Sequence, residues 1–254
     1  MRGDRIHGWK QLGGFVPILA SAAWKDQLRR LGALSYRARP SAGRRTAAAT
    51  LNREQATDEM DDKHACAELI QDWGLYRDQG KWPELRATFV PEGQIAVSWF
   101  SGSFGEFVDR CRASFDAGQR SKHLIFPARV RVAAARALAE TNVVILVRQK
   151  IEGVLADMTS HARFLDRLER RGARWAILER TAIYERDRLD PVEPSEAFDR
   201  LFRAADLSVY PEPYRYMAAR LNAAGRALAP VVHHDGAPHT AQLYARCEAW
   251  IEGR

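Results

Sequence analysis

Four consecutive β-favouring runs in the second half of the chain limit the possible folds more than any other feature. They span residues 123–132, 142–152, 159–168 and 175–184. Apolar and polar residues alternate in them, and the interruptions at 133–140, 152–153 and 170–174 are short. Strands joined by such short links pair as an antiparallel meander. We therefore predict an antiparallel sheet over residues 123–184.

Helical periodicity precedes these strands. Within 66–82, the residues Cys66, Leu69, Ile70 and Trp73 follow i, i+3, i+4, i+7 spacing, which predicts a helix with one buried face. Two further helices are predicted by the spacing of Trp82, Leu85 and Phe89 and of Phe104, Phe107, Cys111 and Phe115, with a turn at 91–93 and a strand over 94–100 between them. Helices followed by an antiparallel sheet predict α+β architecture.

The net charge of +7 belongs to the beginning of the 254-residue chain. Residues 1–50 hold ten Lys and Arg against Asp4 and Asp26, a net charge of +8, so that residues 51–254 total −1. This gives no support to a basic nucleic-acid-binding face on the folded part. The hydrophobic content of 46% is ample for a core in a soluble protein.

We predict three regions. Residues 1–59 form a basic, disordered extension whose apolar run at 15–24 is too short for a membrane span, and we favour an upstream start codon with Met60 as the native initiator. Residues 60–190 form the main domain. Residues 191–254 form a helical extension that wraps the domain, covers its open end or joins a neighbouring subunit. Three scattered cysteines, Cys66, Cys111 and Cys247, suggest neither disulfides nor zinc and fit a cytoplasmic protein.

Asp78 is the first candidate for chemistry because it lies where the helix over 66–82 ends. It either caps the turn at Gln79 and Gly80 or enters a pocket. His123 opens the first predicted strand, either as a core histidine or as a proton-transfer group. Four aromatic residues are candidates for stacking on a ring substrate, although such residues equally suit a core: Trp73, Tyr76, Trp99 and Phe126. Arg148 is a candidate for binding an anionic group, unless it faces solvent. His161 is a secondary candidate for the same cavity.

Three segments carry a resemblance to a known family: Tyr76–Trp82, Ser121–Ile125, and Arg174–Arg180 with Tyr184. Their order and spacing resemble the SnoaL-like branch of the nuclear transport factor 2-like superfamily, which includes scytalone dehydratase, ketosteroid isomerase and bile-acid 7α-dehydratase. The resemblance covers about residues 61–190. It implies a cone-shaped α+β barrel, in which a curved, mostly antiparallel sheet wraps around the N-terminal helices, and a homo-oligomer formed through the open side of the sheet.

The resemblance also implies a site. Asp78 and His123 match the aspartate and histidine that face each other inside the cone of the dehydratases. Such a pair can take and return a proton in a water-poor cavity. The next strand departs from the family pattern, because residues 146–150 contain neither an acid nor a histidine. The identity of the substrate therefore cannot be inherited from the family.

The sequence contains no motif for nucleotide binding, nucleophilic catalysis or zinc binding. It contains no glycine-rich phosphate loop, no nucleophile elbow and no zinc signature. His233, His234 and His239 lie in a stretch of Pro, Gly and Ala without ligand spacing, so we expect no metal and no cofactor. The runs at 166–171 and 184–188 alternate in charge and are interpreted as solvated surface.

Two function classes remain. The first is a lyase or isomerase that acts without a cofactor on a hydrophobic cyclic substrate such as a steroid, polyketide or aromatic intermediate, with Asp78 and His123 as the proton-transfer pair. The second is a non-catalytic partner resembling the small subunit of ring-hydroxylating dioxygenases. The first predicts a cavity beside the pair. The second predicts a filled cone and a large exposed apolar face.

Overall fold

The computed structural model describes residues 47–204 and 206–254, of which residues 51–254 form one compact unit. This unit is built on one eight-stranded sheet. The strands are β1 (Phe89–Val97), β2 (Phe100–Ser103), β3 (Ser121–Ile125), β4 (Arg129–Ala133), β5 (Arg136–Ile151), β6 (Val154–Arg171), β7 (Arg174–Pro191) and β8 (His233–His234). Their order is β2-β1-β7-β6-β5-β3, with β4 also paired to β5 and β8 to β7.

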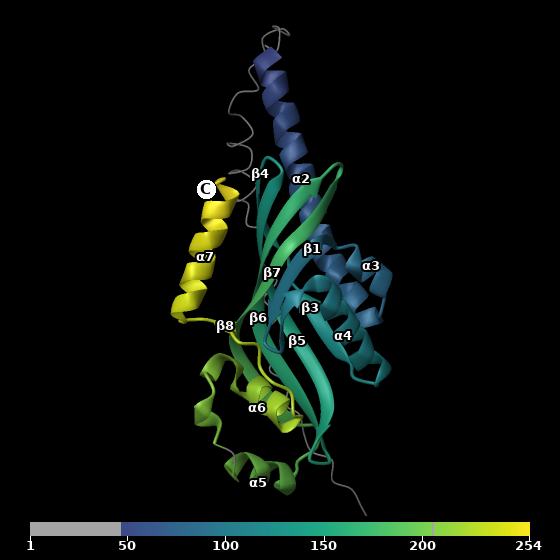
Figure 1. Ribbon diagram of the computed structural model, residues 1–254, viewed down its shortest axis with the longest axis vertical. Helices are drawn as coiled ribbons and strands as arrows, with labels where there is room; N and C mark the ends of the chain where they lie inside the picture. The colour runs from purple at the N-terminus through teal and green to yellow at the C-terminus, as the bar shows by residue number, and fades with distance from the viewer. Residues whose placement is uncertain (1–46, 205) are drawn as a thin grey trace, which may run out of the picture. The chain divides into compact units, whose positions relative to one another are not determined.

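Helices flank both faces of this sheet (Figure 1). They are α2 (Ala47–Gln79), α3 (Trp82–Arg86), α4 (Phe104–Asp116), α5 (Glu196–Ala204), α6 (Arg215–Ala223) and α7 (Pro238–Ile251), with short 3₁₀ turns at Leu207–Val209 and Glu212–Tyr214. The helix α2 begins at Ala47, upstream of the domain boundary predicted at residue 60. Residues 1–46 of the predicted extension lie outside the described residues.

The sheet is mostly antiparallel and curved. Among the strand pairs of the described residues, only β1–β7 and β7–β8 are parallel. Register shifts between β6 and β7 at His161/Ala162 and Arg167/Leu168 mark bulges, which bend a strand and increase its twist. Within the described residues the sheet does not close, since β2 lies at one edge and β3 at the other. The predicted α+β cone is confirmed, with an open wall.

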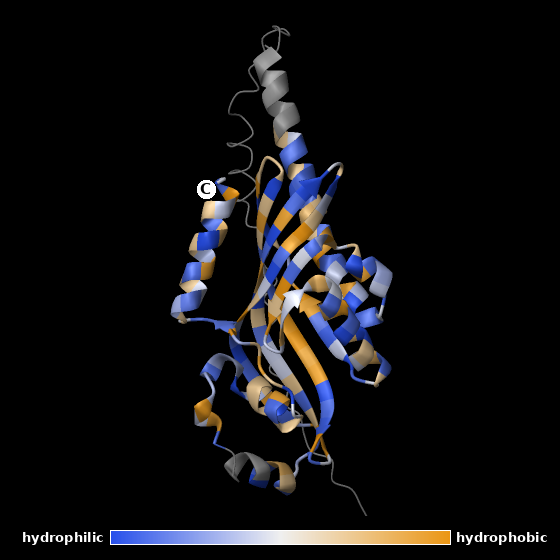
Figure 2. Cartoon of the chain, viewed as in Figure 1, coloured by the Kyte–Doolittle hydropathy of each residue, from blue (hydrophilic) through white to orange (hydrophobic). Residues whose placement is uncertain are grey.

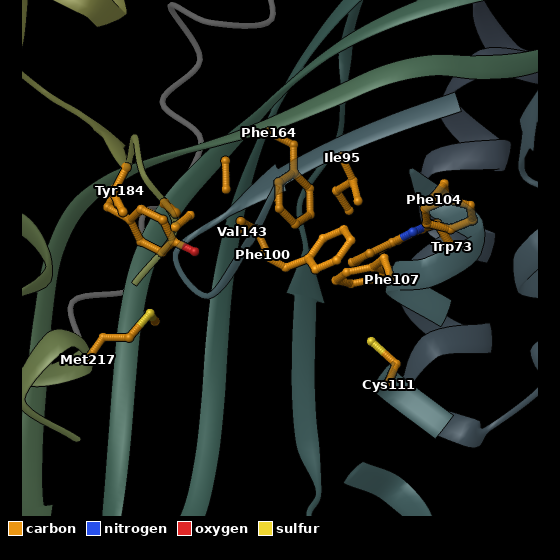
Figure 3. Close-up of a cluster of buried hydrophobic side chains, with 14 of the residues drawn as sticks. Trp73, Ile95, Phe100, Phe104, Phe107, Cys111, Val143, Phe164, Tyr184 and Met217 are labelled. Atoms are coloured by element: carbon orange, nitrogen blue, oxygen red, sulfur yellow. The ribbon is translucent and has the colours of Figure 1, made fainter. Parts of the chain in front are cut away.

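The inner face of the sheet holds the main core. The predicted buried face of α2 is confirmed, because Cys66, Ile70 and Trp73 are at most 1% exposed. The helix α4 begins at the N-cap residue Ser103, whose Oγ accepts a hydrogen bond from the Glu106 amide at 3.3 Å. Figure 3 shows its Phe107 beside Trp73, with ring centroids 6.4 Å apart and stacked. The N-terminal helices thus pack against the concave side.

The outer face is partly covered by α7. Leu243, Cys247 and Ile251 of this helix form a second buried cluster with Leu138, Leu165 and Ile183 of the sheet. Figure 2 shows the alternation of apolar and polar residues that gives the long strands two distinct faces. The C-terminal extension therefore packs on its own domain. Formation of a homo-oligomer through the open side of the sheet stays a prediction.

Several predicted strand boundaries are wrong. The predicted strand over 123–132 is two strands, β3 and β4, separated by residues 126–128, where Pro127 lacks an amide for the ladder. The predicted break at 133–140 shrinks to the turn at Ala134 and Ala135, because residues 136–140 pair with β6. The turn predicted at 91–93 instead lies inside β1, where its register with β7 shifts.

The prediction of a solvated surface at 166–171 is wrong at its first residue. Asp166 and Arg180 lie directly opposite each other on β6 and β7, and both are fully buried. Arg180 Nε lies 2.7 Å from Asp166 Oδ1 and Arg180 Nη2 lies 2.8 Å from Asp166 Oδ2. Sign alternation in the sequence cannot distinguish this buried pair from a solvated one.

Candidate active site

Asp78 is placed by the way α2 ends. The helix stops at Gln79, and Gly80 adopts a left-handed conformation with φ of +72°. The Lys81 amide then donates to the Tyr76 carbonyl at 3.0 Å, which is the pattern of a glycine-terminated helix. Asp78 therefore lies in the last turn, where its side chain is only 5% exposed.

The strand β3 docks closely on this end of α2. A Cβ atom at Gly74 would lie 2.7 Å from Ile125 Cγ1, so that the missing side chain allows the close approach. The Gln71 side-chain amide donates to the Phe126 carbonyl at 3.1 Å. These contacts hold the first residues of β3 beside Asp78.

His123 uses both oxygens of the Asp78 carboxylate. Its backbone amide donates to Oδ2 at 2.7 Å, and its ring Nδ1 lies 2.6 Å from Oδ1. The indole of Trp73 packs edge-on against the imidazole, with centroids 5.4 Å apart. A proton on Nδ1 satisfies the carboxylate and leaves Nε2 unprotonated in the neutral ring. The carboxylate thus faces His123 and not the turn at Gln79 and Gly80.

Burial lowers the pKa of His123 below its usual value, and the positive charges of Arg77 and Arg180 act in the same direction. The hydrogen bond and charge of Asp78 oppose this shift. The neutral imidazole is therefore the form that the folded protein favours. An unprotonated Nε2 held in one orientation can act as a general base.

A cavity of about 260 Å³ lies beside His123. Its apolar wall consists of Trp73, Val97, Trp99, Phe107, Ile145, Val147, Met158, Phe164 and Met217. Tyr184 also lines it, and the Ser98 amide donates to the Tyr184 hydroxyl oxygen at 3.0 Å. Burial raises the pKa of Tyr184, so that the phenol stays protonated. Aromatic walls with a few polar groups are typical of small-molecule sites.

The structure brings four of the predicted residues to this cavity: Trp73, Trp99, His123 and Arg148. Asp78 lies behind His123 and is not itself among the lining residues. The guanidinium of Arg148 pairs with Asp157 through contacts of 2.7 and 2.6 Å and is largely exposed. Arg148 is therefore occupied by a carboxylate of its own chain.

Three predicted substrate-binding residues lie away from the cavity. Tyr76 packs against the main core, and the Phe126 side chain is 46% exposed beyond the end of β3. His161 is partly exposed between Ser160 and Ala162, which are buried on the opposite face of β6. Strand parity therefore points His161 away from the cavity.

Sequence reasoning missed Arg77, Arg120, Arg220 and Arg226, all of which line the cavity. Arg77 directly precedes Asp78 in the sequence. Its position next to a candidate catalytic residue was the one signal that could have indicated it. The last two come from α6 and the segment after it. No local pattern indicated that this segment returns to the cone.

Stability is expected to fall as the pH drops below about 6.5, the usual pKa of histidine in an unfolded chain. His123 has a lowered pKa in the folded state, so the unfolded state binds more protons in this window and is favoured by acid. Urea unfolding at pH 7 and pH 5 should show a smaller loss for His123→Gln than for the unsubstituted protein.

His233 contributes in the same direction, because burial and the charge of His239 lower its pKa to about 4. The variant His233→Gln is therefore measured in parallel, and the double variant should show the smallest acid loss. Equal losses in the unsubstituted protein and in His123→Gln would show that His123 is not protonated differently in the two states.

Within residues 47–204 and 206–254, no group of three or more His, Cys, Asp or Glu side chains is arranged to hold a metal ion. None of the helices in that part of the chain is both long and apolar enough to span a membrane.

Comparisons with known proteins show what this chain is similar to. Residues 58–181 match the family of the SnoaL-like domain. A PEP2-like protein of Fusarium vanettenii is 27% identical over 206 residues, covering 73% of this chain and 84% of its own. An uncharacterised protein of Emericella nidulans is 27% identical over 205 residues, covering 74% and 84%. Both likenesses extend beyond residues 58–181.

A solved structure from Novosphingobium aromaticivorans, described as a nuclear transport factor 2-like protein with a cystatin-like fold, is also similar. It is 22% identical, with a TM-score of 0.41, and the match covers 63% of this chain and 98% of that one.

Proposed function

We propose that this chain, which belongs to the SnoaL-like family through residues 58–181, is a cofactor-free lyase or isomerase that transfers a proton on a hydrophobic cyclic substrate. The observation that carries the proposal is the contact of 2.6 Å between His123 Nδ1 and Asp78 beside an aromatic cavity. The Asp78 carboxylate fixes the ring orientation, and Nε2 is left for the substrate.

The chemistry needs only one base and one hydrogen-bond donor. His123 Nε2 takes a proton from a carbon next to a carbonyl group, and the electron pair moves onto the carbonyl oxygen as an enolate. The imidazolium then returns the proton, either to a leaving hydroxyl group, which departs as water, or to another carbon, which completes an isomerisation. Tyr184 is the candidate donor to the enolate oxygen, because its own oxygen already accepts from Ser98.

The size of the cavity favours small members of the proposed substrate class. A volume of about 260 Å³ lies just below the range of ~300–1,000 Å³ that drug-sized ligand sites occupy. One or two fused rings suit it better than a steroid. The second function class, a non-catalytic partner subunit, predicts a filled cone, and this cavity therefore favours the enzyme.

The proposal is tested by hydrogen exchange into small cyclic ketones in D₂O, followed by ¹H NMR. A base that abstracts a proton next to a carbonyl group catalyses exchange of that proton even when no net product forms. We expect exchange at one ring position of some bicyclic ketones above the buffer rate. Absence of enzyme-dependent exchange across tetralones, indanones and chromanones would contradict the proposal.

A further inference from the structure

We propose that the substrate of this site carries an anionic group, a carboxylate on an aromatic ring, which Arg77, Arg220 and Arg226 bind inside the cavity. This inference rests on the proposed function, since it names the class of molecule that the cavity presents to His123. It rests on the charge balance of the cavity, on the lack of carboxylate partners for these arginines among the described residues and on the nature of the apolar wall.

The cavity lining is strongly positive. Among the described residues, five arginines border it, namely Arg77, Arg120, Arg148, Arg220 and Arg226, and no aspartate or glutamate does. Arg148 is neutralised by Asp157, and Arg120 donates to the backbone carbonyls of Phe115 and Gln119. In the part of the chain that the structure describes, no carboxylate forms an ion pair with the remaining three.

Arg220 is the most confined of the three. It donates from Nη1 to the Gln149 side-chain oxygen at 2.7 Å, while its buried Nε has no partner among the described residues. Burial and the nearby charge of Arg226 lower the pKa of Arg220 to about 10. Two guanidinium groups that repel each other in a partly buried place cost free energy. An anion between them removes both the repulsion and the missing hydrogen bond.

Arg77 and Arg226 approach the same space from other elements. Arg77 comes from the last turn of α2, where its charge acts on both His123 and Cys111. Arg226 lies in the segment after α6 and lines the same cavity as Arg77. Planar guanidinium groups bind two oxygens of a carboxylate or a phosphate in a forked geometry, so these arginines suit an anion of this kind.

The aromatic lining of the cavity indicates what the rest of the substrate is. The guanidinium of Arg226 lies 4.9 Å from the ring centroid of Trp99, and Trp99 stacks on Phe107 with centroids 5.3 Å apart. A flat ring attached to the carboxylate can extend this stack toward Trp73, whose indole contacts His123. The carboxylate then lies among the arginines while the ring faces the base.

The test measures binding of 1-naphthoate and of its neutral analogue 1-naphthamide to the full chain by isothermal titration calorimetry. We expect naphthoate to bind at least tenfold more tightly than the amide. Arg220→Met and Arg226→Met should each weaken naphthoate binding by roughly tenfold or more, as expected for a lost charge-assisted hydrogen bond, and should change amide binding little. The control Arg188→Met removes an exposed arginine that pairs with Asp190 and should leave binding unchanged.

Inorganic phosphate serves as a competitor that carries the charge without the ring. Displacement of naphthoate by phosphate at similar concentrations would show that the arginines form a phosphate site, and would overturn the proposal that they bind a carboxylate. Equal affinity for naphthoate and naphthamide, or loss of both in the arginine variants, would overturn the anion site. The variant His123→Gln separates the two proposals. It should still bind naphthoate, because the anion site is formed by the arginines, and its hydrogen-exchange rate tests the catalytic role of His123 independently.

Discussion

Replacement of His123 by glutamine is expected to lower the rate of enzyme-dependent hydrogen exchange by about 10²–10⁴-fold, the usual contribution of general acid–base catalysis. Glutamine keeps a polar side chain of similar length but cannot take a proton at neutral pH. The backbone amide of residue 123 can still donate to Asp78 Oδ2, as it does at 2.7 Å in the structure. The fold around the site should therefore survive the substitution.

Asp78→Asn should have a smaller effect on the rate and a distinct effect on its pH dependence. The carboxylate raises the pKa of His123 against the effect of burial. Without that charge the imidazole loses its proton at lower pH, so the acidic limb of the pH–rate profile should move to lower pH. A purely structural role for Asp78 would reduce the rate without moving this limb.

The melting temperature and the near-ultraviolet circular dichroism of both variants serve as controls for folding. Exchange rates within a factor of about two of the unsubstituted protein in His123→Gln, with the fold intact, would remove His123 from the mechanism. The same rates would leave the anion site untouched, because that site is measured by binding.

The amphipathic face of α2 and the type of fold could be predicted from the sequence because both rest on periodicity. Cys66, Ile70 and Trp73 recur at helical spacing, and the long strands alternate, so local patterns carry the information. The proximity of Asp78 and His123 was available only through resemblance to a family. Nothing local in either segment indicates that residues 45 positions apart lie 2.6 Å apart.

The arginines of the cavity could not be predicted from local sequence patterns. Arg220 and Arg226 belong to the C-terminal extension, and their contribution depends on how α6 returns to β6 and β7. Arg148 was the expected cation, but it lies opposite Asp157 on the neighbouring strand and is neutralised there. Cross-strand register decides the outcome for Arg148, and register is a property of the whole sheet. The packing of α6 on the strands decides the outcome for Arg220 and Arg226.

Replacement of Asp166 by alanine is expected to destabilise the protein by about 3–5 kcal/mol, the cost of breaking a buried ion pair on one side. Both side chains of the Asp166–Arg180 pair are fully buried. The Arg180 guanidinium contacts the faces of two rings, 4.4 Å from the centroid of Trp73 and 4.3 Å from that of Phe164. Removal of Asp166 leaves this charge with no carboxylate partner in the core. Urea denaturation followed by circular dichroism measures the change in the free energy of unfolding.

The chain contains a matched control for this experiment. Arg148 and Asp157 also lie directly opposite each other on neighbouring strands with two short contacts, but this pair is largely exposed. Water replaces the lost partner at an exposed site, so Asp157→Ala should change the stability far less. The double variant Asp166→Leu with Arg180→Met removes both charges and should recover much of the loss. Equal losses for Asp166→Ala and Asp157→Ala would show that burial does not set the cost of breaking such a pair.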